Sequence, residues 1–132
     1  TIPLQSSFRH LTVCWQCHCK NAVSWSVKQI FTEIYNSKEK FPIKSVGGYS
    51  WRGDNSDSEH CEGLAIDINP YENAQFNGYT GKPMVGSFWK PGKNPYSITP
   101  DGDVVKIFEK YGFGWGNWFG NPDYMHFSYF GT

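Results

Sequence analysis

The chain is 132 residues long and 39% of its residues are hydrophobic, which suits one compact domain with a buried core. Its 12 Lys and Arg residues balance its 12 Asp and Glu residues, so it lacks the basic surface expected of a nucleic-acid-binding protein. No segment contains the roughly 18 consecutive apolar residues that a membrane-spanning helix requires.

The first predicted element is a helix over residues 22–36, where apolar residues recur at helical spacing and form one face. That face consists of Val23, Val27, Ile30, Phe31 and Ile34. Residues 43–52 follow as a predicted strand that runs into a loop. Gly47 and Gly48 allow its backbone to bend or to approach a neighbour.

Residues 64–69 alternate between apolar and other side chains, which predicts a half-buried strand with Asp67 on its polar face. The apolar face consists of Leu64, Ile66 and Ile68. Residues 70–98 are rich in Gly, Pro, Asn and Tyr, and we interpret them as a long irregular loop. Loops of that length are usually functional or mobile.

A second helix is predicted after Thr99, a typical N-cap, and Pro100, which suits the first helical position. It continues through the sequence VVKIFEKY and ends at Gly112, a residue typical of helix C-terminal caps.

A last strand is predicted over residues 125–130, where alternation places His126, Ser128 and Phe130 on one face. The order helix, strands, helix, strand predicts a small α+β domain. We expect this single domain to span residues 1–132, with the Cys-containing segment 1–21 packed on it.

Three possible metal ligands lie at the ends or on the polar faces of these strands, namely His60, Asp67 and His126. His60 precedes a turn at Gly63 and can lie over the face that carries Asp67. His126 opens the last strand, which could pair beside the strand at 64–69. Two imidazoles and one carboxylate would hold a tetrahedral Zn²⁺ and leave one position open for water, as in catalytic zinc sites. A lone histidine is more often structural. The prediction therefore depends on the combination.

A hydrolytic zinc site also needs a general base near the water. Asp123 precedes His126 by three residues, so the two can converge only if residues 121–125 form a turn. The sequence Asn-Pro-Asp at 121–123 is typical of turns, which favours that arrangement. Arg52 is the candidate for stabilising the negative oxygen of a tetrahedral intermediate.

Two motifs resemble those of zinc peptidoglycan peptidases. Residues 58–67, SEHCEGLAID, resemble the signature Ser-x-His-x-x-Gly-x-Ala-x-Asp, and residues 123–127, DYMHF, resemble the second motif, an acidic residue three positions before the last zinc histidine. Residues 112–118, GFGWGNW, are similar to the Trp-containing segment before that motif. The family includes D-alanyl-D-alanine carboxypeptidases of the vancomycin-resistance type and L-alanyl-D-glutamate endopeptidases of phages and bacteria. The similarity extends from about Val23 to Phe130.

The resemblance implies an α+β fold shared with the Hedgehog signalling domain, in which helices flank an antiparallel sheet. It implies one Zn²⁺ per chain on the three candidate ligands, with Asp123 as the base and Arg52 stabilising the transition state. Ser58 would contact the substrate, a peptidoglycan stem peptide. The expected activity is D-Ala-D-Ala carboxypeptidase. Because the carboxypeptidase branch usually has Glu where Asp123 stands, L-Ala-D-Glu endopeptidase activity is the alternative.

Aromatic residues make up 18% of the chain, and such an excess often lines a ligand groove. Trp115, Trp118 and Tyr124 are candidates for the walls of a substrate site, because they lie near the proposed base in the sequence. They could equally pack in a small aromatic core.

The four cysteines are Cys14, Cys17, Cys19 and Cys61. Residues 14–18, CWQCH, match the attachment pattern of c-type haem, and a zinc knot is another possibility. An even number of cysteines in a protein that acts outside the cell favours one or two disulfides, and a bond to Cys61 would tie the N-terminal segment beside His60.

Two classes of function remain open, a zinc hydrolase and a binding module of the same fold that keeps zinc only for stability. For either we expect a monomer that acts outside the cell, at the wall of a bacterium or as a phage protein. A signal or wall-anchoring region is expected to lie outside this sequence.

Overall fold

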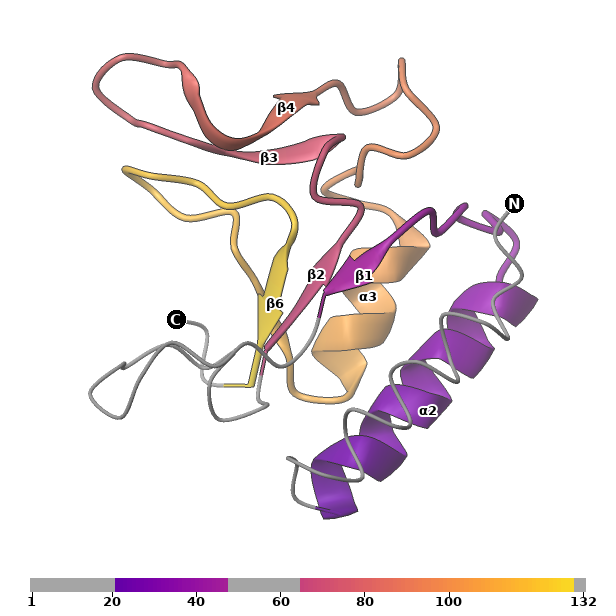
Figure 1. Ribbon diagram of the computed structural model, residues 1–132. Helices are drawn as coiled ribbons and strands as arrows, with labels where there is room; N and C mark the ends of the chain where they lie inside the picture. Colours follow the sequence, from indigo (N-terminus) through magenta and orange to yellow (C-terminus); the bar gives the residue numbers. More distant parts are fainter. Residues whose placement is uncertain (1–20, 48–64, 130–132) are drawn as a thin grey trace.

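The structure is a computed structural model that describes residues 21–47 and 65–129 (Figure 1). Several predictions fall outside the described residues, including the packing of the N-terminal segment and the course of the first predicted strand after Gly47. The same holds for Arg52, Ser58, His60, Cys14, Cys17, Cys19 and Cys61. Within the described part, two helices pack with antiparallel sheets, which confirms the α+β class.

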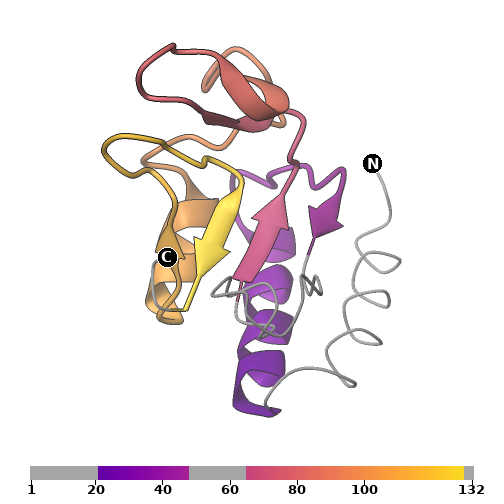
Figure 2. The same ribbon diagram turned by 60° about the vertical axis from the view of Figure 1, so that its left-hand side comes forward.

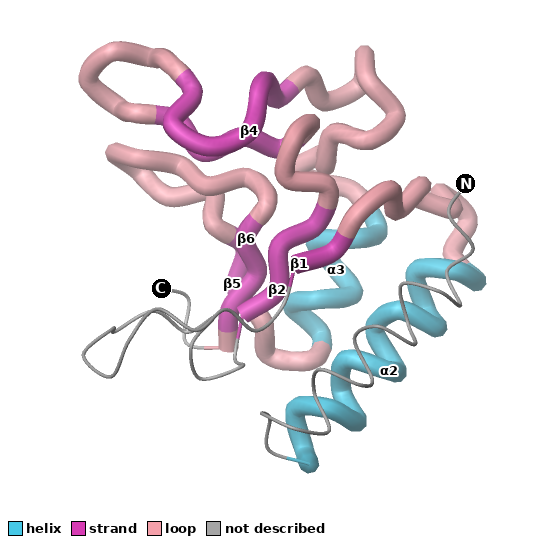
Figure 3. Tube along the Cα trace, in the orientation of Figure 1, coloured by secondary structure: helices cyan, strands magenta, loops and turns pink. Residues whose placement is uncertain are grey.

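Helix α2 (Asn21–Asn36) is the helix that the apolar spacing predicts. Together with helix α3 (Asp103–Lys110) it covers one face of the sheet (Figures 2 and 3). The buried side chains of the two helices are Val27, Ile30, Phe31, Ile34, Val104, Val105 and Phe108. In the described ranges, no helix has the length and apolar character needed to cross a membrane.

A four-stranded antiparallel sheet lies against these helices. Its strands, in spatial order, are β1 (Val46–Gly47), β2 (Ala65–Ile68), β6 (His126–Ser128) and β5 (Gly114–Trp115). Phe127 of β6 stacks on Phe108 of α3 with ring centroids 4.0 Å apart. β6 pairs with β2, so the last predicted strand lies beside the strand at 64–69, as expected.

Part of the other face of this sheet is covered as well. Ala65 and Ser128 are partners across β2 and β6, and both are fully buried although they point away from the helices. The prediction of a half-buried strand was wrong in this respect. Alternation reveals an apolar face, but it does not reveal whether another segment covers the opposite one.

The interpretation of residues 70–98 as irregular was wrong, because they contain a second, two-stranded sheet. It consists of β3 (Asn73–Phe76) and β4 (Pro83–Trp89), drawn above the four-stranded sheet in Figure 1. The register shifts within β3, and Gly86 in β4 has a φ of +79°. Such irregularities interrupt the alternation of side chains, so the sequence does not show the pattern that predicts strands.

Two buried asparagines fasten this hairpin to the rest of the domain. The side chain of Asn69 accepts a hydrogen bond from Lys44 N–H at 2.6 Å and donates one to the Tyr96 carbonyl at 3.1 Å. Asn73 donates to the same carbonyl at 2.9 Å and accepts from Ile98 N–H at 2.6 Å. Since these backbone groups are satisfied by the two amides, the hairpin has a defined place beside the sheet.

Helix α3 starts later than its sequence predicts. It begins at Asp103, after a turn closed by a 3.0 Å hydrogen bond from Gly102 N–H to the Thr99 carbonyl, so Thr99 is not its N-cap. The acceptor comes instead from Glu39, whose Oε2 receives the Asp103 N–H at 2.6 Å. The C-terminal prediction is confirmed, because Gly112 has a φ of +87° and follows the last helical turn.

Replacing Glu39 with alanine is expected to lower the free energy of unfolding by about 1 kcal/mol, because the first turn of α3 loses its acceptor. Urea denaturation measures this loss. The matched control is Thr99→Ala, because the sequence predicts Thr99 as the N-cap and the structure does not use it. Its effect on the free energy of unfolding should stay within about 0.5 kcal/mol. A larger loss for Thr99→Ala than for Glu39→Ala would contradict the assignment.

Candidate functional site

Asp67 and His126 lie opposite each other on the central strands of the sheet. They are partners in the antiparallel register of β2 and β6, next to the pair Ile66 and Phe127. Because Ile66 and Phe127 are buried in the helical core, alternation directs Asp67 and His126 to the other face. The Nδ1 atom of His126 is 3.3 Å from Oδ1 of Asp67.

The spacing and burial of this pair suit metal ligation. Two donors bound to one Zn²⁺ at about 2.0–2.1 Å with tetrahedral angles lie about 3.4 Å apart. The observed 3.3 Å between the two donor atoms fits that edge. The His126 side chain is 7% exposed and that of Asp67 21%, so the carboxylate still reaches solvent. A neutral imidazole and a carboxylate are both common zinc ligands, and the pair therefore fits the ion.

The third predicted ligand, His60, lies outside the described residues, as do Arg52 and Ser58. Among residues 21–47 and 65–129, His, Cys, Asp and Glu side chains form no group of three that could hold a metal. The complete zinc site therefore stays a prediction, and the structure brings two of its three members together.

Asp123 lies in a turn that directly precedes β6. His126 N–H donates to the Asp123 carbonyl at 3.1 Å, which closes the turn. The condition for Asp123 and His126 to converge is therefore met. Oδ1 of Asp123 is shielded from solvent.

The second sheet supports this turn. Gln75 of β3 forms an antiparallel bridge with Asp123, and Phe76 N–H donates to the Pro122 carbonyl at 2.9 Å. The segment that lacks a regular pattern in the sequence thus holds the proposed base in place. No local signal could have revealed this support, since the partners lie almost fifty residues apart along the chain.

Trp118 is the one of the three candidate aromatic residues that lies against a proposed metal ligand. Its ring centroid is 5.4 Å from that of His126, and its side chain is partly exposed. Trp118 can therefore border a ligand at this site.

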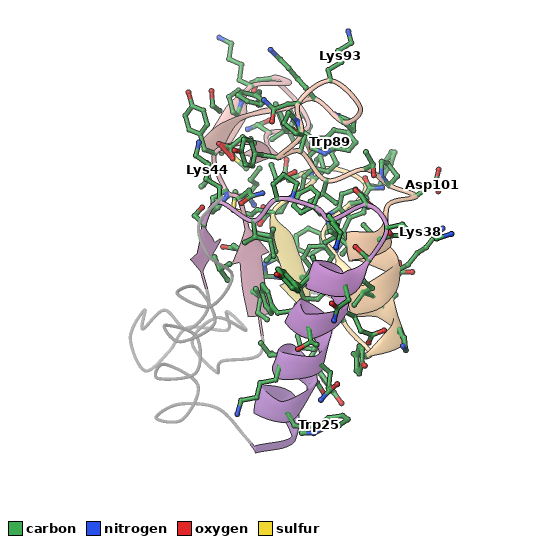
Figure 4. All side chains as sticks on the ribbon, turned by 90° about the vertical axis from the view of Figure 1, so that its right-hand side faces the viewer. Trp25, Lys38, Lys44, Trp89, Lys93 and Asp101 are labelled. Atoms are coloured by element: carbon green, nitrogen blue, oxygen red, sulfur yellow. The ribbon has the colours of Figure 1, made fainter. Side chains whose placement is uncertain are left out.

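Trp115 and Tyr124 pack with Trp89 of β4. The sequence analysis missed Trp89 because it lies in the segment that was interpreted as an irregular loop. Tyr124 stacks on Trp89 with centroids 3.7 Å apart, and Trp115 Nε1 donates to the Tyr124 carbonyl at 2.8 Å. Figure 4 shows Trp89 among the side chains between the hairpin and the four-stranded sheet. Burial raises the pKa of the Tyr124 phenol. These contacts make the cluster a support for the turn at Asp123.

Comparison with known protein families yields a match to this chain. A family model described as D-alanyl-D-alanine carboxypeptidase matches residues 52–129, more than half of the chain. The matched range contains Asp67, Asp123 and His126. No curated protein and no solved structure matches the chain significantly.

Proposed function

Since the chain belongs to the D-alanyl-D-alanine carboxypeptidase family, we propose that it is a zinc-dependent peptidase that removes the terminal D-alanine from peptidoglycan stem peptides. The observation that carries this proposal is the Asp67–His126 pair, 3.3 Å apart and next to the turn that holds Asp123.

The proposed metal ligands are His60, Asp67 and His126. When bound there, Zn²⁺ would supply an acidified water and a Lewis acid for the substrate carbonyl. The backbone pairing of β2 with β6 sets Asp67 opposite His126, with Oδ1 and Nδ1 3.3 Å apart, and this spacing supports their assignment as ligands. His60 would join them from the segment before β2.

The proton is handled by Asp123. Its carboxylate accepts a proton from the attacking water as the water oxygen bonds to the carbonyl carbon. Arg52 stabilises the negative charge that develops on the carbonyl oxygen. When the C–N bond breaks, Asp123 returns the proton to the leaving amine. Ser58 contacts the substrate, and Trp118 borders it beside His126.

A second activity, cleavage between L-alanine and D-glutamate, is favoured by one observation. Asp123 is one methylene shorter than the Glu expected of the carboxypeptidase branch, so the base would have to lie closer to the attacking water. The two activities leave different products from the same substrate. We further propose that the protein acts as a monomer at the bacterial cell wall, outside the cytoplasm.

Incubation of the zinc-loaded protein with purified muropeptides, followed by mass spectrometry, tests the proposal. We expect the loss of one terminal alanine, whereas a stem peptide released from its sugar-linked L-alanine would indicate endopeptidase activity. Protein stripped of zinc by a chelator should be inactive and should recover when zinc is restored. If the zinc-loaded protein cleaves no stem peptide, a binding module of the same fold becomes the better description.

A further inference from the structure

Gly116, just after β5, connects the proposed base to a proposed metal ligand. Its N–H donates to the His126 carbonyl at 2.8 Å, and its own carbonyl accepts from Asp123 N–H at 2.7 Å. His126 N–H in turn donates to the Asp123 carbonyl at 3.1 Å. Each of the three residues donates one hydrogen bond and accepts one within the group, so the three backbone segments form a closed circuit.

The circuit leaves no room for a side chain at position 116. A Cβ atom there would lie 2.3 Å from the Asp123 carbonyl oxygen and 3.2 Å from Cβ of His126. Real Cβ atoms essentially never approach a backbone oxygen that closely, and Asp123 would have to move. The φ of Gly116 is not positive, so the requirement for glycine here is one of space and not of backbone conformation.

The surroundings restrict where the turn could move. On one side, Asp123 is bridged to Gln75 of β3. On another side, Trp115 Nε1 donates a hydrogen bond to the Tyr124 carbonyl at 2.8 Å. Because Asp123 and His126 share a hydrogen bond, a displaced Asp123 carbonyl changes the relative placement of both residues.

We propose that Gly116 is a positioning residue of the site, which sets the placement of the Asp123 carboxylate relative to the His126 imidazole through this circuit. The inference rests on the proposed function, since that placement matters chemically only if His126 binds the metal and Asp123 transfers the proton. It assigns to Gly116 a role in metal binding without any contact with the metal.

Gly116→Ala tests the role, with Gly102→Ala as the matched control. A Cβ at position 102 would also lie too close to its neighbours, 2.4 Å from Thr99 Oγ1 and 3.1 Å from the Thr99 carbonyl oxygen, but at the start of α3. The measurements are the Zn²⁺ dissociation constant, from competition with a chromophoric chelator, and the visible absorption spectrum of the Co²⁺-loaded protein. We expect Gly116→Ala to weaken Zn²⁺ binding about 10–100-fold and to alter the Co²⁺ bands. Substitution of groups that hold a metal ligand in place has effects of this size. Gly102→Ala should lose stability but keep wild-type metal affinity and spectrum.

A folded Gly116→Ala variant with wild-type Zn²⁺ affinity and Co²⁺ spectrum would overturn the positioning role, while the proposed function would stand. If the wild-type protein does not bind Zn²⁺, the proposed function fails and the role of Gly116 fails with it. If Gly116→Ala does not fold, amide hydrogen exchange of the wild-type protein decides. Slow exchange at residues 116, 123 and 126 together supports the circuit, and fast exchange at any of them overturns it.

Discussion

Replacing His126 with alanine should weaken Zn²⁺ binding by about 10²–10³-fold. Zinc sites with four protein ligands bind with about 10–16 kcal/mol, or about 2.5–4 kcal/mol per ligand, and about 1.4 kcal/mol corresponds to tenfold. His126 Nδ1 lies 3.3 Å from Asp67 Oδ1. Without the imidazole, Asp67 is the one proposed zinc ligand left among the described residues. Competition with a chromophoric chelator measures the dissociation constant.

Two controls separate loss of a ligand from loss of structure. His10→Ala removes a histidine that lies outside both motifs, and it should leave the dissociation constant unchanged. Urea denaturation of metal-free His126→Ala checks that the domain still folds, since His126 is buried in the sheet. If a folded His126→Ala protein binds as much zinc as the wild type, His126 is not a ligand.

Replacing Asp123 with asparagine should lower kcat/KM for stem-peptide cleavage by about 10²–10⁴-fold, the usual contribution of a general acid-base residue. Asparagine keeps the shape of aspartate and the backbone hydrogen bonds to Gly116 and His126, but its amide cannot accept the proton. Zinc affinity should therefore stay within a few-fold of the wild type. Rates from mass spectrometry and chelator competition together give both quantities.

Asp123→Glu is the companion variant, because it restores a carboxylate on a side chain one methylene longer. It should recover part of the activity that asparagine removes, if proton transfer is what Asp123 contributes. Its products also show whether the length of the base affects which bond is cut. Wild-type activity in Asp123→Asn would exclude Asp123 as the base.

Local patterns predicted the elements that have one regular apolar face. The spacing of Val27, Ile30, Phe31 and Ile34 predicted α2, and its buried face is the expected one. The alternation at 64–69 and 125–130 located β2 and β6. These predictions succeed because a periodic apolar face has to be buried whatever it packs against.

The same kind of reasoning failed where a distant residue supplies the contact or where the register shifts. Glu39, not Thr99, provides the acceptor at the start of α3. The hairpin of β3 and β4 shows no regular alternation, because bulges and the left-handed Gly86 interrupt it. At the start of α3 the deciding hydrogen bond joins residues 64 positions apart, so no local window contains both partners. In the hairpin the paired residues are close in sequence, but the shifted register hides the alternation.

For the site, the sequence indicated which residues take part, and the tertiary structure decided how they are placed relative to one another. Residue types and their order along the chain were sufficient to propose Asp67, His126 and Asp123, because a carboxylate, an imidazole and a turn-borne acid have few alternative uses in that combination. Their relative placement depends on strand register, which sets Asp67 opposite His126, and on the backbone of Gly116 between Asp123 and His126. Register and close backbone approach arise only when separate segments pack together, so they could not be read from the order of the residues.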